Sequence, residues 1–176
     1  MDMSQIDKLP TAERFSKRVI LKVSKIVKVE SHPGGSMLYI LTLDTGDSEE
    51  RQIVSSIVPF YTAQELLGKN IVLVYNLKPA NFRGVRSNGM LLAASDPTVT
   101  DKETCEVIFA PQFEKGTILE PEGFTPPQEE LCYVKPDTFF QMPLCTKDGI
   151  VYLEDKKIGA DGKFLTVEVY KNGSVG

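Results

Sequence analysis

The stretch between residues 76 and 90 concentrates the side chains of this chain that could do chemistry. It reads Asn76-Leu77-Lys78-Pro79-Ala80-Asn81-Phe82-Arg83-Gly84-Val85-Arg86-Ser87-Asn88-Gly89-Met90. Lys and Arg supply positive charge, while amides, hydroxyls and backbone N–H groups supply fixed donors, so this composition suits the binding of phosphates. A solvated hairpin loop is the alternative that composition alone leaves open.

Five predicted strands and one helix must position this loop. The strands are expected at residues 19–30, 38–44, 51–56, 71–77 and 90–95. Thr62 and Glu65 form a capping box for a short helix between the third and fourth strands, and Gly68 suits its end. This order is typical of the all-β OB-fold barrel, whose loops 1–2 and 4–5 usually hold the ligand. An SH3-like barrel is the rival, although it usually lacks such a helix.

The first strand carries one irregularity. Lys25 falls on the otherwise apolar parity of residues 19–30, and Ile26 falls on the polar parity. We therefore expect a bulge or bend near Ser24 and Lys25, which would let one long strand serve both sides of a small barrel.

The segments on either side of the barrel are less regular. Residues 1–17 are expected to be a lead-in, with a short helix starting at Thr11. Beyond residue 97 we expect an irregular β-rich lobe that packs against the barrel, with short strands at 106–109, 150–153 and 165–170. Phe139, Phe140 and Met142 in this lobe need a place to be buried.

The charge distribution separates the two halves. The formal net charge is −4, yet residues 14–100 hold eleven Lys or Arg against seven acids, whereas residues 101–176 hold eight against fourteen. A basic centre masked by an acidic C-terminal segment is compatible with a polyanionic partner. We find neither a signal peptide nor a membrane-spanning run, and the three cysteines fit reduced thiols, so a cytoplasmic location is expected.

The sequence contains no recognisable set of catalytic residues, so an enzymatic function is not predicted. The single histidine, His32, lies in a turn, where we expect it to touch ligand or face water rather than act as a base. Glycine-rich phosphate loops and metal-binding motifs are missing, so neither a cofactor nor a metal is predicted.

Several short motifs follow one another along the chain, each occurring once. They are Lys25-Ile26-Val27-Lys28-Val29-Glu30-Ser31-His32-Pro33, Leu38-Tyr39, Asp44-Thr45-Gly46, Arg51-Gln52-Ile53-Val54-Ser55, Asn76-Leu77-Lys78-Pro79, Arg83-Gly84-Val85, Ser87-Asn88-Gly89-Met90 and Ala94-Ser95. In this order and spacing the chain resembles the tRNA-binding domain of the endothelial monocyte-activating polypeptide II type, which is appended to methionyl-, tyrosyl- or lysyl-tRNA synthetases.

The resemblance implies an OB-fold tRNA-binding domain over residues 18–97. It also implies a C-terminal lobe over residues 98–176 that imitates a dimer interface and leaves the protein monomeric. The implied function is non-catalytic, largely sequence-independent tRNA binding for a synthetase that is joined in cis or in trans, without a membrane. A protein-interaction module of a synthetase complex and a cytokine-like polypeptide stay open as alternatives.

The loop and the resemblance together select ten candidate RNA-binding residues. Six would meet phosphates, three would bond riboses or bases, and one would pack against a base or sugar. They are Lys25, Lys28, Arg51, Lys78, Arg83 and Arg86, then Asn76, Ser87 and Asn88, and finally Met90.

Overall fold

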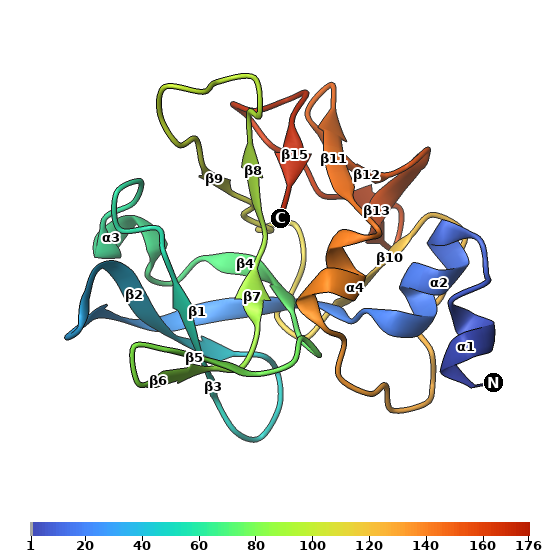
Figure 1. The fold of residues 1–176 in the computed structure, drawn as a ribbon, viewed down its shortest axis with the longest axis horizontal. Helices are drawn as coiled ribbons and strands as arrows, with labels where there is room; N and C mark the ends of the chain where they lie inside the picture. The colour runs from blue at the N-terminus through green and yellow to red at the C-terminus, as the bar shows by residue number, and fades with distance from the viewer. Residues whose placement is uncertain (1) are drawn as a thin grey trace.

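A computed structural model describes residues 2–176 of the chain, and it is β-rich and antiparallel (Figure 1). Two short helices open it, α1 (Met3–Ile6) and α2 (Thr11–Arg18). The barrel follows with β1 (Leu21–His32), β2 (Gly35–Asp44), β3 (Arg51–Ser55), α3 (Ala63–Leu66), β4 (Asn70–Val74), β5 (Ala80–Phe82), β6 (Val85–Ser87), β7 (Met90–Leu91) and β8 (Ala93–Ser95).

The strands of the barrel have the predicted OB-fold order. β1 pairs with β2 and β4, β2 pairs with β3, and β4 pairs with β7. The circle closes near Asn88, whose N–H donates to the Gln52 carbonyl of β3 at 2.9 Å. Helix α3 starts with the complete capping box of Thr62 and Glu65, as predicted.

Strand β1 serves both sides of the barrel. Its first half, Leu21 to Lys25, pairs with β4, and the pairing with β2 runs from Lys25 to His32. The register with β2 shifts between Ile26 and Lys28, so Val27 is the extra residue of a bulge. The predicted irregularity is confirmed, although it lies two residues later than expected. It turns Ile26 into the core and leaves Val27 exposed.

The fifth predicted strand divides into two. β7 stays in the barrel, whereas β8 pairs with β9 (Glu106–Val107) and with β15 (Ser174–Val175). Between them, Leu92 is fully buried. The chain thus leaves the barrel and enters the C-terminal lobe within a single extended segment.

The C-terminal lobe contains more regular structure than its sequence predicts. Besides β9, β15 and the predicted β12 (Ile150–Leu153), it holds β10 (Ile118–Pro121), α4 (Pro136–Phe140), β11 (Leu144–Lys147), β13 (Lys156–Ala160) and β14 (Lys163–Phe164). The predicted strand at residues 165–170 is wrong, since that segment makes only one isolated bridge, between Thr166 and Ile150. Phe139 and Met142 are buried as expected, whereas Phe140 is 51% exposed.

Two hydrophobic clusters stabilise the molecule. The first fills the barrel interior and includes Ile26, Leu41 and Ile53. The second, which we call the shared cluster, lies between the barrel and the rest of the chain. It joins Phe15 of α2 to Val72 and Val74 of β4 and to Phe139 of α4. The expected helix from Thr11 is confirmed, and its Phe15 is fully buried. No helix within residues 2–176 is long and apolar enough to span a membrane.

Candidate nucleic-acid interface

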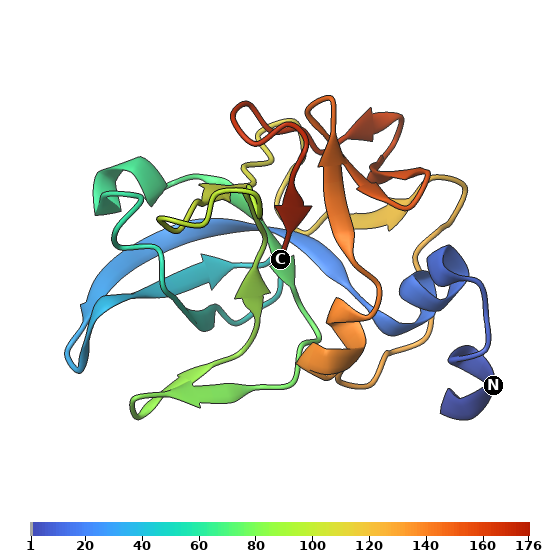
Figure 2. The same cartoon turned by 45° about the horizontal axis from the view of Figure 1, so that its top comes forward.

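The cationic connection between β4 and β7 contains a β-hairpin. β5 and β6 pair with Asn81 opposite Arg86, and the turn between them is Arg83-Gly84. Both turn residues have positive φ, 49° and 86°, as the tight type I′ hairpin turn requires. The hairpin projects from the barrel on the side away from β11, β12 and β13 (Figure 2).

The tip of this hairpin is fixed to the turn between β1 and β2. His32 Nδ1 accepts the Gly34 N–H at 2.9 Å, so its Nε2 carries the proton that is donated to the Phe82 carbonyl at 2.8 Å. Arg83 Nη1 donates to the Gly34 carbonyl at 3.0 Å. His32 is 5% exposed, so its predicted contact with ligand or water is wrong. Its role is to join the two loops that border an OB-fold ligand site.

The base of the hairpin is fixed to β3. Ser87 Oγ accepts the Val54 N–H and donates to the Gly89 carbonyl, both at 2.9 Å, and Gln52 Nε2 donates to the Arg86 carbonyl at 2.9 Å. Ser87 is 3% exposed. The structure therefore contradicts Ser87 as an RNA contact, because its hydroxyl replaces a backbone partner where β3 and the hairpin do not pair as strands.

Asn76 is a second correction. Its Oδ1 accepts the Ile20 N–H at 2.9 Å, and its Nδ2 donates to the carbonyls of Arg18 and Cys132 at 2.8 and 2.9 Å. The side chain is buried. Since its polar atoms bind two other chain segments, residues 18–20 and Cys132, Asn76 is a structural junction and is removed from the candidate RNA contacts.

Five of the predicted cations are exposed. They are Lys25 and Lys28 on β1, Lys78 before the hairpin, and Arg83 and Arg86 within it. Lys28 lies 3.4 Å from Glu30 in an ion pair whose side chains are both largely exposed, so water can replace that contact at little cost. Arg86 Nε donates to Asn88 Oδ1 at 2.9 Å, which fixes both side chains.

Arg51 is held more firmly than the other cations. Its guanidinium carbon lies 3.8 Å from the centre of the Tyr75 ring, and its Nη1 donates to the carbonyls of Tyr75 and Asn88. Stacking on an aromatic face and carbonyl contacts both stabilise a guanidinium in one orientation. Arg51 is thus an organising residue of the site as well as a positive charge.

Tyr75 also engages Asp47, in a cluster that the sequence did not reveal. Lys22 Nζ lies 2.9 Å from Asp47 Oδ1, and the Tyr75 and Thr45 hydroxyls donate to Oδ2. Burial opposes ionisation of Asp47, but the hydrogen bonds from Tyr75 and Lys22 outweigh it and hold the pKa of Asp47 below its ordinary value. Burial, followed by the bond to this carboxylate, raises the pKa of Tyr75.

A hollow of about 530 Å³ lies beside these side chains. Arg51, Gln52, Arg86 and Asn88 line it from the barrel, and Tyr133 lines it from the C-terminal lobe. The loop between β2 and β3 contributes residues 47–50, three of which are acids. Gln52 and Tyr133 were missed because a lone glutamine and a lone tyrosine carry no pattern in the sequence.

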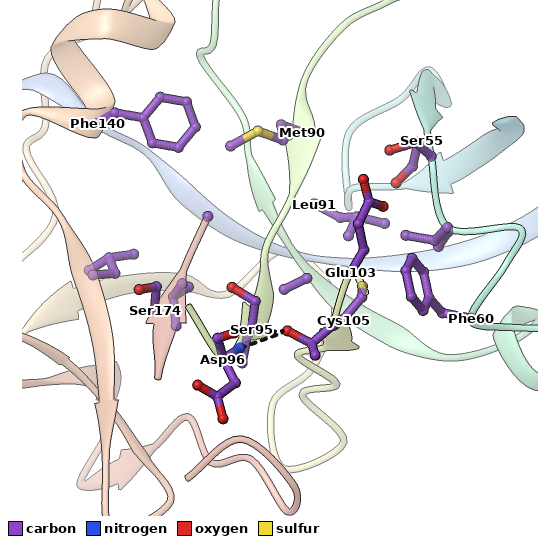
Figure 3. A pocket seen from close by; sticks show the side chains of 18 of the residues that line it. Ser55, Phe60, Met90, Leu91, Ser95, Asp96, Glu103, Cys105, Phe140 and Ser174 are labelled. Atoms are coloured by element: carbon purple, nitrogen blue, oxygen red, sulfur yellow. Dashed lines mark hydrogen bonds between the residues drawn. The ribbon is translucent and has the colours of Figure 1, made fainter. Parts of the chain in front are cut away.

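Met90 lies in a different place from the cations. It packs against the shared cluster and lines a groove of about 760 Å³ between the barrel and the C-terminal lobe. Figure 3 shows its side chain and the Phe140 ring pointing toward one another across this groove. Met90 therefore lines a different depression from the one that Arg86 lines, and its contact with a base or sugar stays a prediction. Burial raises the pKa of Cys105, in the same groove, to about 11, so this thiol is a poor nucleophile.

Residues 2–176 contain no group of three or more His, Cys, Asp or Glu side chains that could hold a metal ion. What the arrangement does provide is charge, fixed amide groups and an exposed aromatic ring on one face. Those features suit the binding of a polyanion with accessible bases.

Comparison with known proteins places this geometry in a family. The model of the family described as "Putative tRNA binding domain" matches residues 21–117. The chain belongs to this family. The match begins with β1 and extends past the barrel to the residue before β10, so it includes the hairpin and its exposed cations.

Proteins with similar sequences are much longer than this chain. Methionine–tRNA ligase of Treponema denticola is 41% identical over 179 residues, a match that covers 96% of this chain and 23% of the ligase. The ligase of Treponema pallidum is 37% identical over 166 residues, which cover 92% of this chain and 20% of the ligase. The chain thus spans about a fifth to a quarter of these relatives.

Two solved structures resemble the fold. The C-terminal domain of Plasmodium vivax p43 has a TM-score of 0.78 at 24% identity, and the match covers 91% of this chain and 98% of that one. A MetRS related protein from Pyrococcus horikoshii has a TM-score of 0.51 at 31% identity, with 67% of this chain and 95% of the other covered. The Plasmodium structure therefore matches the C-terminal lobe as well as the barrel.

Proposed function

We propose that this chain is a non-catalytic tRNA-binding module of a methionyl-tRNA synthetase. It holds tRNA by charge and shape and raises the tRNA concentration near the catalytic part of the enzyme. The observation that carries the proposal is the set of exposed cations on and beside the β5–β6 hairpin, on a face that the acidic C-terminal lobe leaves open.

The contact set differs from the one that the sequence predicts. Lys78, Arg83 and Arg86 meet phosphates first, and Lys25 and Lys28 of β1 are further exposed cations that meet phosphates. Arg51 and Asn88 are anchored groups that orient the ribose and base. Buried Asn76 and Ser87 support the surface from below, and Met90, which packs against the shared cluster, keeps its proposed contact with a base or sugar.

A salt series with total tRNA tests the electrostatic part. If four to six phosphates are neutralised, log K falls against log salt with a slope of about −3 to −5. Fluorescence anisotropy of labelled tRNA at several salt concentrations measures it. A flat response would remove charge as the basis of binding and favour a protein-interaction role.

For Arg83, substitution by asparagine disturbs the turn less than substitution by alanine does. Because Arg83 has φ of 49°, Arg83→Asn creates an Asn-Gly turn that suits the same backbone. Loss of the guanidinium should weaken binding by about 1–3 kcal/mol and do so about equally for different tRNAs. Strong selectivity for one tRNA that this change abolishes would contradict binding by charge and shape.

The domain arrangement is part of the same proposal. Residues 18–97 form the tRNA-binding barrel, and residues 98–176 form a lobe that covers the apolar side of β4 in place of a second subunit. The burial of Val72 and Val74 in the shared cluster supports this arrangement. The chain is then a monomer in the cytoplasm, and sedimentation equilibrium that gives a dimer at micromolar concentration would contradict it.

A further inference from the structure

The hollow beside the cationic hairpin has one wall that phosphate binding does not explain. Tyr133, from the C-terminal lobe, is 62% exposed and lines the hollow together with Arg51, Gln52, Arg86 and Asn88 of the barrel. We infer that the hollow receives one unpaired nucleobase of the bound RNA, stacked on the Tyr133 ring. This inference rests on the proposed function and names the part of the RNA that this site takes.

The backbone on both sides of Tyr133 is fixed. Asn76 Nδ2 donates to the Cys132 carbonyl at 2.9 Å, the Val134 N–H donates to the Asn76 carbonyl at 2.8 Å, and the Lys78 N–H donates to the Val134 carbonyl at 2.9 Å. Leu77 and Val134 also form a parallel bridge. Tyr133 is thus an exposed ring on an immobilised backbone, which lowers the entropy lost when a base stacks on it.

The polar side of the hollow suits the edge of a base. Arg86 Nε donates to Asn88 Oδ1, so the amide nitrogen of Asn88 is the end that this bond leaves unused. Arg51 is held by the Tyr75 ring and two carbonyls, and Gln52 is held through its Nε2. Fixed amides and guanidinia are the groups that read base edges, and aromatic rings are the usual stacking surface for unpaired bases in RNA.

The acidic side chains that line the hollow disfavour a phosphate group inside it. Asp47, Glu49 and Glu50 line it together with the two guanidinia, so a phosphate there would meet repulsion as well as attraction. A neutral base with both donors and acceptors avoids that repulsion. The volume of about 530 Å³ lies within the range of small-ligand pockets and suits one nucleoside rather than a duplex.

Substitution of Tyr133 tests the stacking contact. Tyr133→Leu should weaken tRNA binding about tenfold, within the range measured for single base–aromatic stacks, and leave the salt slope unchanged because no charge is lost. Tyr133→Phe keeps the ring and should stay within about twofold of wild type. Phe140→Leu is the matched control, because Phe140 is an exposed aromatic of the same lobe that lines the other groove.

A second measurement separates this inference from the proposed function. Single-stranded RNA hexamers that carry 5-iodouridine should crosslink to Tyr133, as mapped by peptide mass spectrometry, and a duplex of the same length should not. The inference would be overturned if Tyr133→Leu bound tRNA as tightly as the wild type, with the same salt slope, and if no crosslink to Tyr133 formed. The proposed function would not be affected by that result. A crosslink from the hexamer to Tyr133 in a protein that does not bind tRNA would support nucleobase binding in the hollow and would contradict the proposed tRNA-binding function.

Discussion

The two sides of strand β4 are covered by different parts of the chain, the barrel interior on one side and the C-terminal lobe with α2 on the other. Ile71 and Leu73 point into the barrel interior, whereas Val72 and Val74 point outward into the shared cluster. On that outward side the acidic C-terminal lobe and Phe15 of α2 replace water. The hairpin that follows β4 has polar and cationic side chains instead, and it stays exposed.

One short barrel thus has separate sides for stability and for binding. Apolar burial stabilises the side toward the C-terminal lobe, while the opposite side can keep charges that would be costly to bury. The segment around Tyr133 is the exception, because the lobe there reaches the base of the hairpin.

The largest expected effect would come from the shared cluster. Phe139→Ala should lower the free energy of unfolding by about 3–5 kcal/mol, because a fully packed aromatic ring beside Phe15 is lost. Urea denaturation followed by far-UV circular dichroism measures it, with exposed Phe140→Ala as the control. If the barrel unfolded at its wild-type urea concentration while the lobe unfolded earlier, the two halves would not share a core.

Asn76→Ala should produce the next largest loss, about 2–4 kcal/mol of stability, since three backbone partners on two other segments, residues 18–20 and Cys132, would lose their hydrogen bonds to the buried amide. The same denaturation experiment measures it, and Asn81→Ala on exposed β5 is the matched control. An Asn76→Ala protein with full stability and weak tRNA binding would return Asn76 to the RNA surface.

Glu120 gives a test by pH on the covered side. Burial raises its pKa from the ordinary 4.5 to about 7, and the nearby Ser16 hydroxyl offsets only part of this rise. The folded protein therefore holds this proton more tightly than the unfolded chain, so stability should fall as pH rises from about 4.5 to 7. Glu120→Gln should remove this fall and stabilise the protein by about 1–3 kcal/mol at pH 8.

Denaturation at pH 5 and pH 8 checks the Glu120 prediction, with exposed Glu114→Gln as the control. A wild-type protein whose stability did not fall over this range, or a Glu120→Gln protein with an unchanged pH profile, would show that water reaches this carboxylate.

The smallest effect is expected for a single exposed cation. Lys78→Gln should weaken tRNA binding by about 0.5–1 kcal/mol, reduce the magnitude of the salt slope by about one, and leave stability unchanged. Anisotropy over a salt series measures the first two. Lys171→Gln, an exposed change on the C-terminal lobe, should alter none of the three, and an equal loss there would place RNA on both sides of the molecule.

Local patterns predicted much of the barrel. The strand order, the capping box of α3 and the irregularity in β1 all follow from short-range signals such as parity, caps and turn residues. The C-terminal lobe was predicted less well because its strands are short and pair with distant segments, as β8 does with β15. Tertiary pairing outweighs local preference in strands of this kind.

The candidate site divides in the same way. Lys78, Arg83 and Arg86 are exposed, as charge in a turn-rich loop predicts, whereas Asn76 and Ser87 have residue types that suit both RNA contacts and buried junctions. Composition cannot distinguish these roles, since each depends on which backbone groups lie within hydrogen-bond distance.

The barrel, the family and the cationic character of the connection after β4 could all be predicted from the residues alone, because strand parity, turn chemistry and charge are local properties. Three outcomes depend on the folded arrangement: which polar residues of that connection are buried, that His32 and Arg83 join two loops, and that Tyr133 lines the same hollow as Arg86 from more than forty residues away. Those outcomes depend on packing between distant segments, where a buried polar group must find a partner and an exposed one need not.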